Sequence, residues 1–184
     1  MFIQTEATPN PATLKFMPGR EVMGTQSPMD FPNADSANAS PLAMSLFRTG
    51  LVAGVFLGSD FIAVTKTDGE WQHVKPALLA AIMDHFVAGL PVMNAGAVPQ
   101  GTEDNSDEDP TVSAIKQLID TRIRPAVAQD GGDIVFQDFT DGVVSLHMRG
   151  ACAGCPSATA TLKQGIENML RHYVPEVIEV RAVI

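Results

Sequence analysis

Residues 142–173 read GVVSLHMRGACAGCPSATATLKQGIENMLRHY, and two different periods meet in this stretch. Up to Gly150, apolar residues alternate with polar ones, which is typical of a strand with one buried face. From Pro156 onward, apolar residues recur every three or four positions, which is typical of an amphipathic helix. We therefore expect a strand, a short loop and a helix. The strand should bury Val144, Leu146 and Met148, and the helix Ala158, Leu162, Ile166, Met169 and Tyr173.

The flanking sequence extends this pattern to a complete small domain. Residues 112–130 carry a helical stripe whose last turn Pro125 should distort. Residues 133–139 and 143–150 flank Thr-Asp-Gly, a hairpin signal, and residues 176–184 alternate again. The predicted order is helix, strand, strand, helix, strand. The first stripe consists of Val112, Ile115, Ile119, Ile123 and Ala126, and the last strand should bury Ile178, Val180, Ala182 and Ile184.

Residues 1–93 predict a second small α+β domain. Ser40 followed by Pro41 is an N-cap and a first-turn proline, so a helix should begin there. The strands end at tight turns, and the longer helix has one apolar face. Strands are expected over residues 13–17, 51–58 and 60–66, helices over residues 41–48 and 74–90, and a loop over residues 24–40.

The two halves are joined by residues 94–110, NAGAVPQGTEDNSDEDP. This segment has five acidic side chains and no aromatic residue, so burial of apolar surface cannot offset the entropy of ordering it. We interpret it as a flexible acidic linker between domains 1–93 and 111–184; a long surface loop inside one domain is the alternative. The expected fold class is α+β, in two small domains.

The composition limits the kind of protein. With 184 residues, 45% of them hydrophobic and 18% charged, the chain is globular. Its net charge of −9 argues against a nucleic-acid partner, which requires a basic face. No apolar run approaches the ~18 residues of a membrane span, and the start shows no basic targeting segment. We therefore expect no membrane partner and a cytoplasmic location.

Both cysteines of the chain, Cys152 and Cys155, lie in the loop between the predicted strand and helix. Small neighbours allow the loop to curl around a ligand. The helix N-terminus and Arg149 should lower the pKa of both thiols and so favour thiolates. Both sulfurs should face solvent at the rim of the domain.

Four interpretations fit a lone Cys-x-x-Cys pair. The thiols can be structural, or a redox dithiol, although Pro156 keeps the second cysteine out of the helix, unlike in thioredoxin-like proteins. They can also be half of a zinc or an iron–sulfur site, each of which needs four ligands. His147 lies on the polar face of a strand, where a solvated histidine is expected. The simplest source of two more thiolates is a second copy of the chain, related by a two-fold axis.

Several stretches resemble a known family. DGGDIVF (residues 130–136) and HMRGACAGCPSATATLKQGIENML (residues 147–170) resemble the C-terminal domain of NifU-type iron–sulfur scaffold and carrier proteins. TPNPATLKFMPG (residues 8–19), residues 40–66 and residues 71–86 resemble the N-terminal domain of Nfu proteins. The resemblance covers nearly the whole chain except the linker.

The resemblance implies a [4Fe–4S] cluster bridged between two subunits by Cys152 and Cys155. It implies that an upstream donor supplies the cluster and that apo iron–sulfur client proteins receive it from a homodimer. No acid–base or nucleophile–base pair is evident, so we expect no enzyme. A dithiol–disulfide oxidoreductase and a zinc-bridged structural dimer are the alternatives. Gly150, Gly154 and Pro156 should shape the loop, and Arg149 should offset the charge of the cluster.

Overall fold

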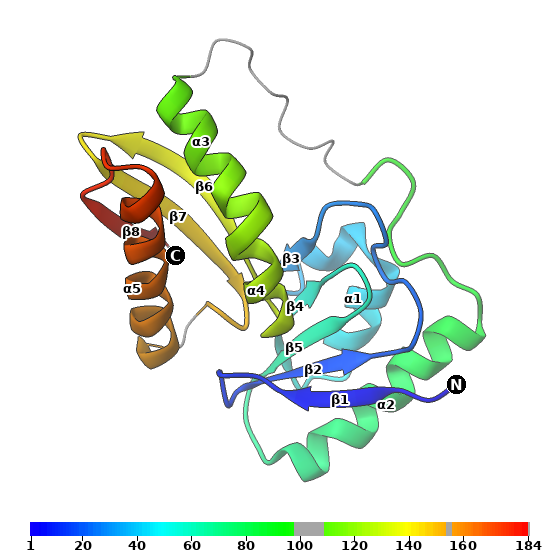
Figure 1. Ribbon diagram of the computed structural model, residues 1–184. Coiled ribbons are helices and arrows are strands. Elements are labelled where there is room, and N and C mark those ends of the chain that lie inside the picture. The colour runs from blue at the N-terminus through cyan, green and yellow to red at the C-terminus, as the bar shows by residue number, and fades with distance from the viewer. Residues whose placement is uncertain (98–108, 154–155, 184) are drawn as a thin grey trace. The chain divides into compact units, whose positions relative to one another are not determined.

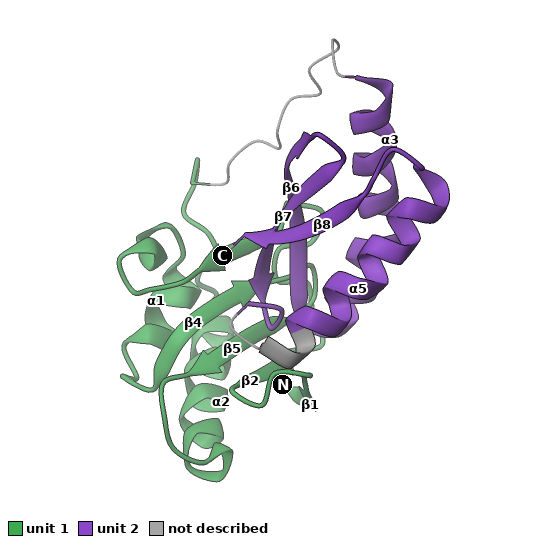
Figure 2. Ribbon diagram, turned by 90° about the vertical axis from the view of Figure 1, so that its left-hand side faces the viewer, with its two compact units in different colours: residues 1–101 green, residues 102–184 purple. Residues whose placement is uncertain are grey.

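The computed structural model describes residues 1–97, 109–153 and 156–183, with the backbone alone for residues 156–158. The chain divides into two compact units, Met1–Gly101 and Thr102–Ile184 (Figure 2). Each unit has helices and a sheet of its own, which confirms an α+β fold in two domains. The predicted linker, residues 94–110, falls mostly outside the described residues, and its limits stay a prediction. None of the helices in the described ranges is long and apolar enough to cross a membrane.

The N-terminal unit is an antiparallel sheet with two helices (Figure 1). Its core joins apolar residues of the sheet to the buried faces of both helices, among them Phe16, Leu46, Ile62, Leu78 and Ile82. The strand order is β1-β2-β5-β4-β3. The elements are β1 (Gln4–Ala7), β2 (Thr13–Met17), β3 (Met29–Phe31), a 3-10 turn (Ser36–Ala39), α1 (Pro41–Phe47), β4 (Val52–Leu57), β5 (Ile62–Lys66) and α2 (Trp71–Val87).

Three predicted strands and both predicted helices of this unit are confirmed, and Ser40 caps α1 as expected. The Ser40 hydroxyl accepts a hydrogen bond from the Ala43 amide (3.1 Å) and donates one to the Val92 carbonyl (2.6 Å). The predicted loop over residues 24–40 is partly wrong, because it contains β3 and the 3-10 turn. β1 (QTEA) has no apolar alternation and β3 (MDF) is only three residues long, so periodicity could not reveal either edge strand.

His85 is an unusual side chain on the buried face of α2. It is 3% exposed, and neither ring nitrogen has a hydrogen-bond partner in the described part of the chain. Burial lowers the pKa of His85, and the backbone carbonyls of Pro91 and Leu90, which lie near the ring without hydrogen-bond geometry, offset only part of that effect. The neutral imidazole is therefore the form that the folded unit holds.

Acidification is expected to destabilise the N-terminal unit through His85. Because the folded pKa lies below the unfolded one, this stability is present above about pH 6.5 and is lost as the pH falls toward the folded pKa. For a single proton the slope of this loss is at most about 1.4 kcal/mol per pH unit. Urea unfolding at pH 7.5 and 5.5, followed by the single tryptophan, Trp71, should show this loss in the wild type and not in His85→Leu. The exposed His73 of the same helix provides the control, since His73→Leu should keep the wild-type pH dependence of the free energy of unfolding. An equal pH dependence of this free energy in His85→Leu and in the wild type would contradict the prediction.

The C-terminal unit has a three-stranded sheet in the order β6-β7-β8, with helices on one of its faces (Figure 1). β6 (Gly132–Thr140) and β7 (Val143–Gly150) form an antiparallel hairpin, which Asp141 and Gly142 close with φ values of 51° and 78°. β7 then crosses over through α5 (Pro156–Tyr173) to the parallel strand β8 (Glu179–Val183). The predicted strand face is confirmed. Val144, Leu146 and Met148 are all buried, and they share one core with residues of α5 and of the helical segment over residues 110–129.

The first helix of this unit is interrupted by a wide turn. α3 (Pro110–Leu118) is followed by a π-helical turn (Ile119–Ile123) and by α4 (Arg124–Gln129). The Arg124 amide donates to the Ile119 carbonyl, five residues back. Pro125 cannot donate an α-helical hydrogen bond, and a distortion is present, but it lies in the turn before the proline; the prediction that the last turn is distorted is wrong, since α4 is α-helical to Gln129.

The π-turn changes which residues face the core. Buried residues recur at every fourth position, and an α-helix alone would rotate such a stripe by about 40° per step. The wider π-turn advances the side chains by less per residue, which cancels this drift, so the buried stripe continues to Val127. The prediction that Ala126 is buried is wrong for this reason. The buried residues are Ile115, Ile119, Ile123 and Val127.

Two further predictions of burial in this unit are wrong. Tyr173 is 50% exposed, with Arg122 over its ring at 5.2 Å, and Leu170 is buried in its place. The phenol hydroxyl favours such a partly solvated site near a helix end. Ile178 is 61% exposed because it precedes β8, where its amide donates to the Gly142 carbonyl (2.7 Å).

Candidate functional site

The cysteine loop begins where β7 ends, at Gly150, whose φ is 63°. The Ala153 amide donates to the Gly150 carbonyl (3.0 Å), which closes a turn, and the Ala151 amide donates to the Gly131 carbonyl (3.1 Å). The Thr159 hydroxyl donates to the Cys152 carbonyl (3.2 Å). The first half of the loop is therefore fastened both to the start of β6 and to the first turn of α5.

Cys152 does not face solvent. Its side chain is 7% exposed and belongs to the apolar core of the unit. Burial, followed by the negative charges of Asp130 and Asp133, raises the pKa of Cys152 to about 12. The predictions of an exposed sulfur and of a lowered thiol pKa are therefore wrong for Cys152 in this conformation, because burial and two nearby carboxylates outweigh the helix N-terminus and Arg149.

Cys155 and Gly154 lie outside the described residues, and so does the side chain of Pro156. The assignment of Cys152 and Cys155 as a ligand pair therefore stays a prediction. Within residues 1–97, 109–153 and 159–183, no group of three or more His, Cys, Asp or Glu side chains could hold a metal ion. His147 is half-buried on β7, between Val135 and Val183 in the strand register.

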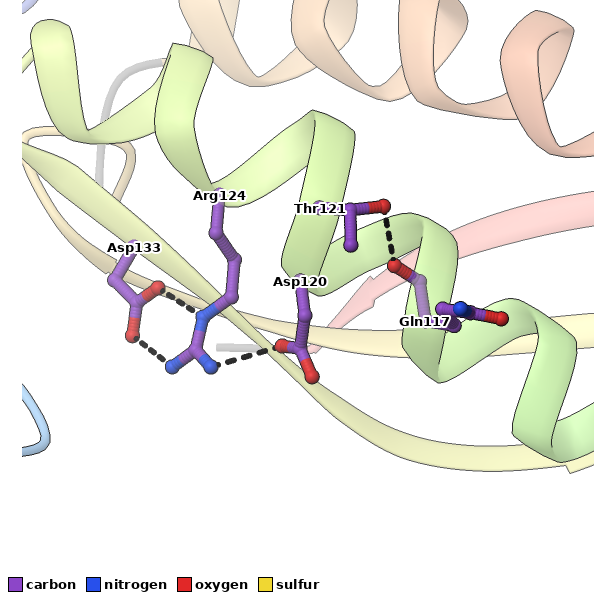
Figure 3. Close-up of polar contacts among 5 residues, drawn as sticks. All are labelled: Gln117, Asp120, Thr121, Arg124 and Asp133. Atoms are coloured by element: carbon purple, nitrogen blue, oxygen red, sulfur yellow. Dashed lines mark hydrogen bonds and ion pairs between the residues drawn. The ribbon is translucent and has the colours of Figure 1, made fainter.

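A buried ion pair lies beside the loop, at the start of β6 (Figure 3). The Arg124 guanidinium donates from Nε to Asp133 Oδ1 (2.8 Å) and from Nη2 to Asp133 Oδ2 (3.0 Å). Nη1 donates to Asp120 Oδ1 (2.9 Å). The Asp133 side chain is only 5% exposed, whereas that of Asp120 is 59% exposed. These hydrogen bonds, those to Asp133 first, raise the pKa of Arg124, so the guanidinium stays charged.

The network anchors the start of β6 against α4. Asp133 pairs with Arg149 in the β6–β7 register, and the preceding Gly132 pairs with Gly150, the last residue before the loop. An isolated carboxylate at the position of Asp133 would be costly, and the bidentate Arg124 compensates its charge. The contact between the Gly131-Gly132-Asp133 segment and the cysteine loop was not predicted from the sequence. The hairpin register could have revealed it, since counting back from the Thr-Asp-Gly turn places residue 133 opposite residue 150, one position from its observed partner because of the bulge between Phe136 and Asp138.

The comparisons with known proteins match the two units separately. The NifU-like domain matches residues 115–181, and the N-terminal domain of Nfu/NifU scaffold proteins matches residues 3–89. Proteins named "NFU1 iron-sulfur cluster scaffold homolog, mitochondrial" are 53% identical in Drosophila sechellia and 52% identical in Drosophila erecta, over 184 residues. These matches cover 100% of this chain and 65% of each relative, so the chain spans about two thirds of the length of these curated relatives.

A solution structure of a NifU-like protein from Saccharomyces cerevisiae is 26% identical, with a TM-score of 0.46. This match covers 52% of this chain and 86% of that one.

The prediction of a cytoplasmic location is wrong. The curated relatives are named mitochondrial. The prediction depended on the absence of a targeting segment at the start of the chain, and a chain that spans 65% of its relatives carries no information on what precedes it.

Two observations decide the family. The two domain matches together cover most of the chain, and the relatives are about half identical to it over its full length. The chain belongs to the NifU-like family, with an Nfu-type N-terminal domain ahead of its NifU-like domain.

Proposed function

We propose that this chain is an iron–sulfur cluster carrier that binds a [4Fe–4S] cluster between two copies of itself, through Cys152 and Cys155, and passes it to apo client proteins. One observation carries the proposal: both thiols of the chain lie in a single strand–helix loop, three positions apart. The names of the curated relatives, which are iron–sulfur cluster scaffold homologues, support the choice of cargo.

The number of ligands supports a cluster shared between chains. One chain offers two thiolates, whereas a [4Fe–4S] cluster takes four. A two-fold axis through the loop supplies the other two from an identical surface. A centre held by two chains can be taken apart one thiolate at a time, which suits a donor of clusters better than a permanent electron carrier.

The proposal assigns a role to each part of the chain. Residues 111–184 form the cluster-binding domain, residues 1–93 recognise the donor or the clients, and residues 94–110 link them. Transfer of a preformed cluster needs no general acid or base from the chain, so we assign it no catalysis. The relatives' names support the mitochondrion as its compartment.

Anaerobic purification followed by native mass spectrometry tests this function. We expect a brown dimer with about four iron and four sulfide ions per two chains, and at least partial dissociation to monomers when the cluster is stripped. A colourless zinc-containing dimer would instead identify a structural site. A metal-free chain that cycles between dithiol and disulfide would identify an oxidoreductase, and a complete cluster on one chain would exclude the shared site.

A further inference from the structure

The Cys152 thiol occupies a space that exists only because residue 132 is a glycine. A Cβ atom added to Gly132 would lie 2.4 Å from Cys152 Sγ, 3.1 Å from the Arg149 carbonyl oxygen and 3.2 Å from Cys152 Cβ, so its shortest contact by far is with the sulfur. Real side chains do not approach so closely, so the thiol and a methyl group at residue 132 exclude each other. The φ of Gly132 lies outside the left-handed region, unlike that of Gly131 (77°). The glycine at position 132 is therefore needed for space and not for a turn.

The protein around this space is held in place. Gly132 pairs with Gly150 across the hairpin, and the Ala151 amide donates to the Gly131 carbonyl. The neighbouring Asp133 is fixed by two hydrogen bonds from Arg124. Because the strand cannot easily withdraw from the thiol, any change in the position of the sulfur has to come from Cys152 itself.

A sulfur in this position cannot reach a cluster shared with another chain. Cys152 is 7% exposed and packs in the core of its own unit. We propose, on the basis of the proposed function, that Gly132 forms a seat that stores the Cys152 thiol in the cluster-free chain, and that Cys152 leaves this seat when a cluster is loaded. Gly132 is a positioning residue, since it acts through Cys152. The seated thiol is shielded from oxidants and alkylating agents because its sulfur is buried in the core of the unit.

Alkylation kinetics test the seat in the full chain. In the Cys155→Ser variant, Cys152 is the single thiol, and iodoacetamide labelling of the reduced, metal-free protein can be followed by mass spectrometry. We expect labelling to be at least about 100-fold slower in the folded chain than in the same chain unfolded in urea, because reaction requires an exposed thiolate. Equal rates in the two states would overturn the seat.

Filling the seat should release the thiol. Adding Gly132→Ala to this variant should speed labelling of the folded chain at least about tenfold. Gly165→Ala, in α5, is the matched control, because a Cβ there meets nothing within 4 Å, and its rate should stay within about twofold of the parent. A folded Gly132→Ala chain that labels like its parent would overturn the proposal. If circular dichroism shows that Gly132→Ala is unfolded, the labelling rates of Cys152 in the folded and the urea-unfolded parent chain decide by themselves whether the thiol is sheltered.

Cluster loading of the otherwise wild-type chain separates the two proposals. If Gly132→Ala acquires iron and sulfide faster than the wild type, the need to leave the seat is supported; an equal or slower rate overturns that step. If the wild type acquires no cluster, the proposed function fails, whereas the labelling rates still decide whether Gly132 shelters the thiol.

Discussion

Cys152→Ala and Cys155→Ala should each lose the cluster completely. Reconstituted wild-type protein should hold about two iron ions per chain, and either variant should hold close to none, because two chains then offer only two of the four thiolates that a [4Fe–4S] cluster requires. Iron and sulfide analysis after anaerobic reconstitution measures this directly. The folded state should survive, although Cys152→Ala should cost about 1 kcal/mol, since it removes a buried sulfur from the core.

His147→Ala is the control for this experiment. His147 is the histidine nearest to the cysteine pair in the sequence, and we expect the variant to keep its full iron content. Wild-type iron in either cysteine variant would refute the ligand assignment. Thermal unfolding of each variant has to be measured alongside, so that loss of iron is not mistaken for loss of the folded state.

Arg124→Ala should destabilise the C-terminal unit by about 3 kcal/mol. The substitution leaves the Asp133 carboxylate, which is 5% exposed, without its guanidinium partner. Breaking a buried ion pair in this way costs about 3–5 kcal/mol, and the lower figure applies because Arg124 is itself 35% exposed and partly solvated. Differential scanning calorimetry should show the midpoint of this unit lowered by roughly 10–20 °C.

The other carboxylate of the network provides the matched control. Asp120→Ala removes the exposed hydrogen bond to the same guanidinium, and the cost should be below about 1 kcal/mol, as for other solvated ion pairs. Equal losses in Arg124→Ala and Asp120→Ala would show that the burial of Asp133 has no energetic importance. A loss near zero in Arg124→Ala would contradict the prediction outright.

Periodicity was sufficient for the parts of the fold where one face is buried along a whole element. The alternation in β7 and the hairpin signal at Asp141 and Gly142 are local features, so the sequence alone predicted them correctly. Periodicity failed to predict burial where the burial of a residue depends on a neighbouring element. Val127 replaces Ala126 in the core because a π-turn changes the helical phase, and Ile178 is exposed because β8 begins one residue later.

The cysteine motif and its position between strand and helix were also predictable, but the state of the thiol was not. A loop at a helix N-terminus, taken by itself, favours thiolates. The state of the Cys152 thiol depends instead on the space at Gly132, a residue 20 positions earlier, which the sulfur fills, and on nearby carboxylates that raise its pKa. Spacing within the loop contains no information on either contact.

The π-turn sets the angular phase of everything that follows it in the helix. A π-turn takes one residue more than an α-helical turn, and each residue of an α-helix advances the direction of the side chains by about 100°, so winding Ile119–Ile123 as α-helix at unchanged length would rotate α4 by about that angle relative to α3. Val127 would then turn out of the core, and the Arg124 guanidinium would point away from Asp133. Loss of the π-turn at constant length would therefore act like a double substitution at Arg124 and Val127, and its effect would reach the strand that lies against Cys152, whereas deleting one residue from the turn would leave the direction of α4 nearly unchanged.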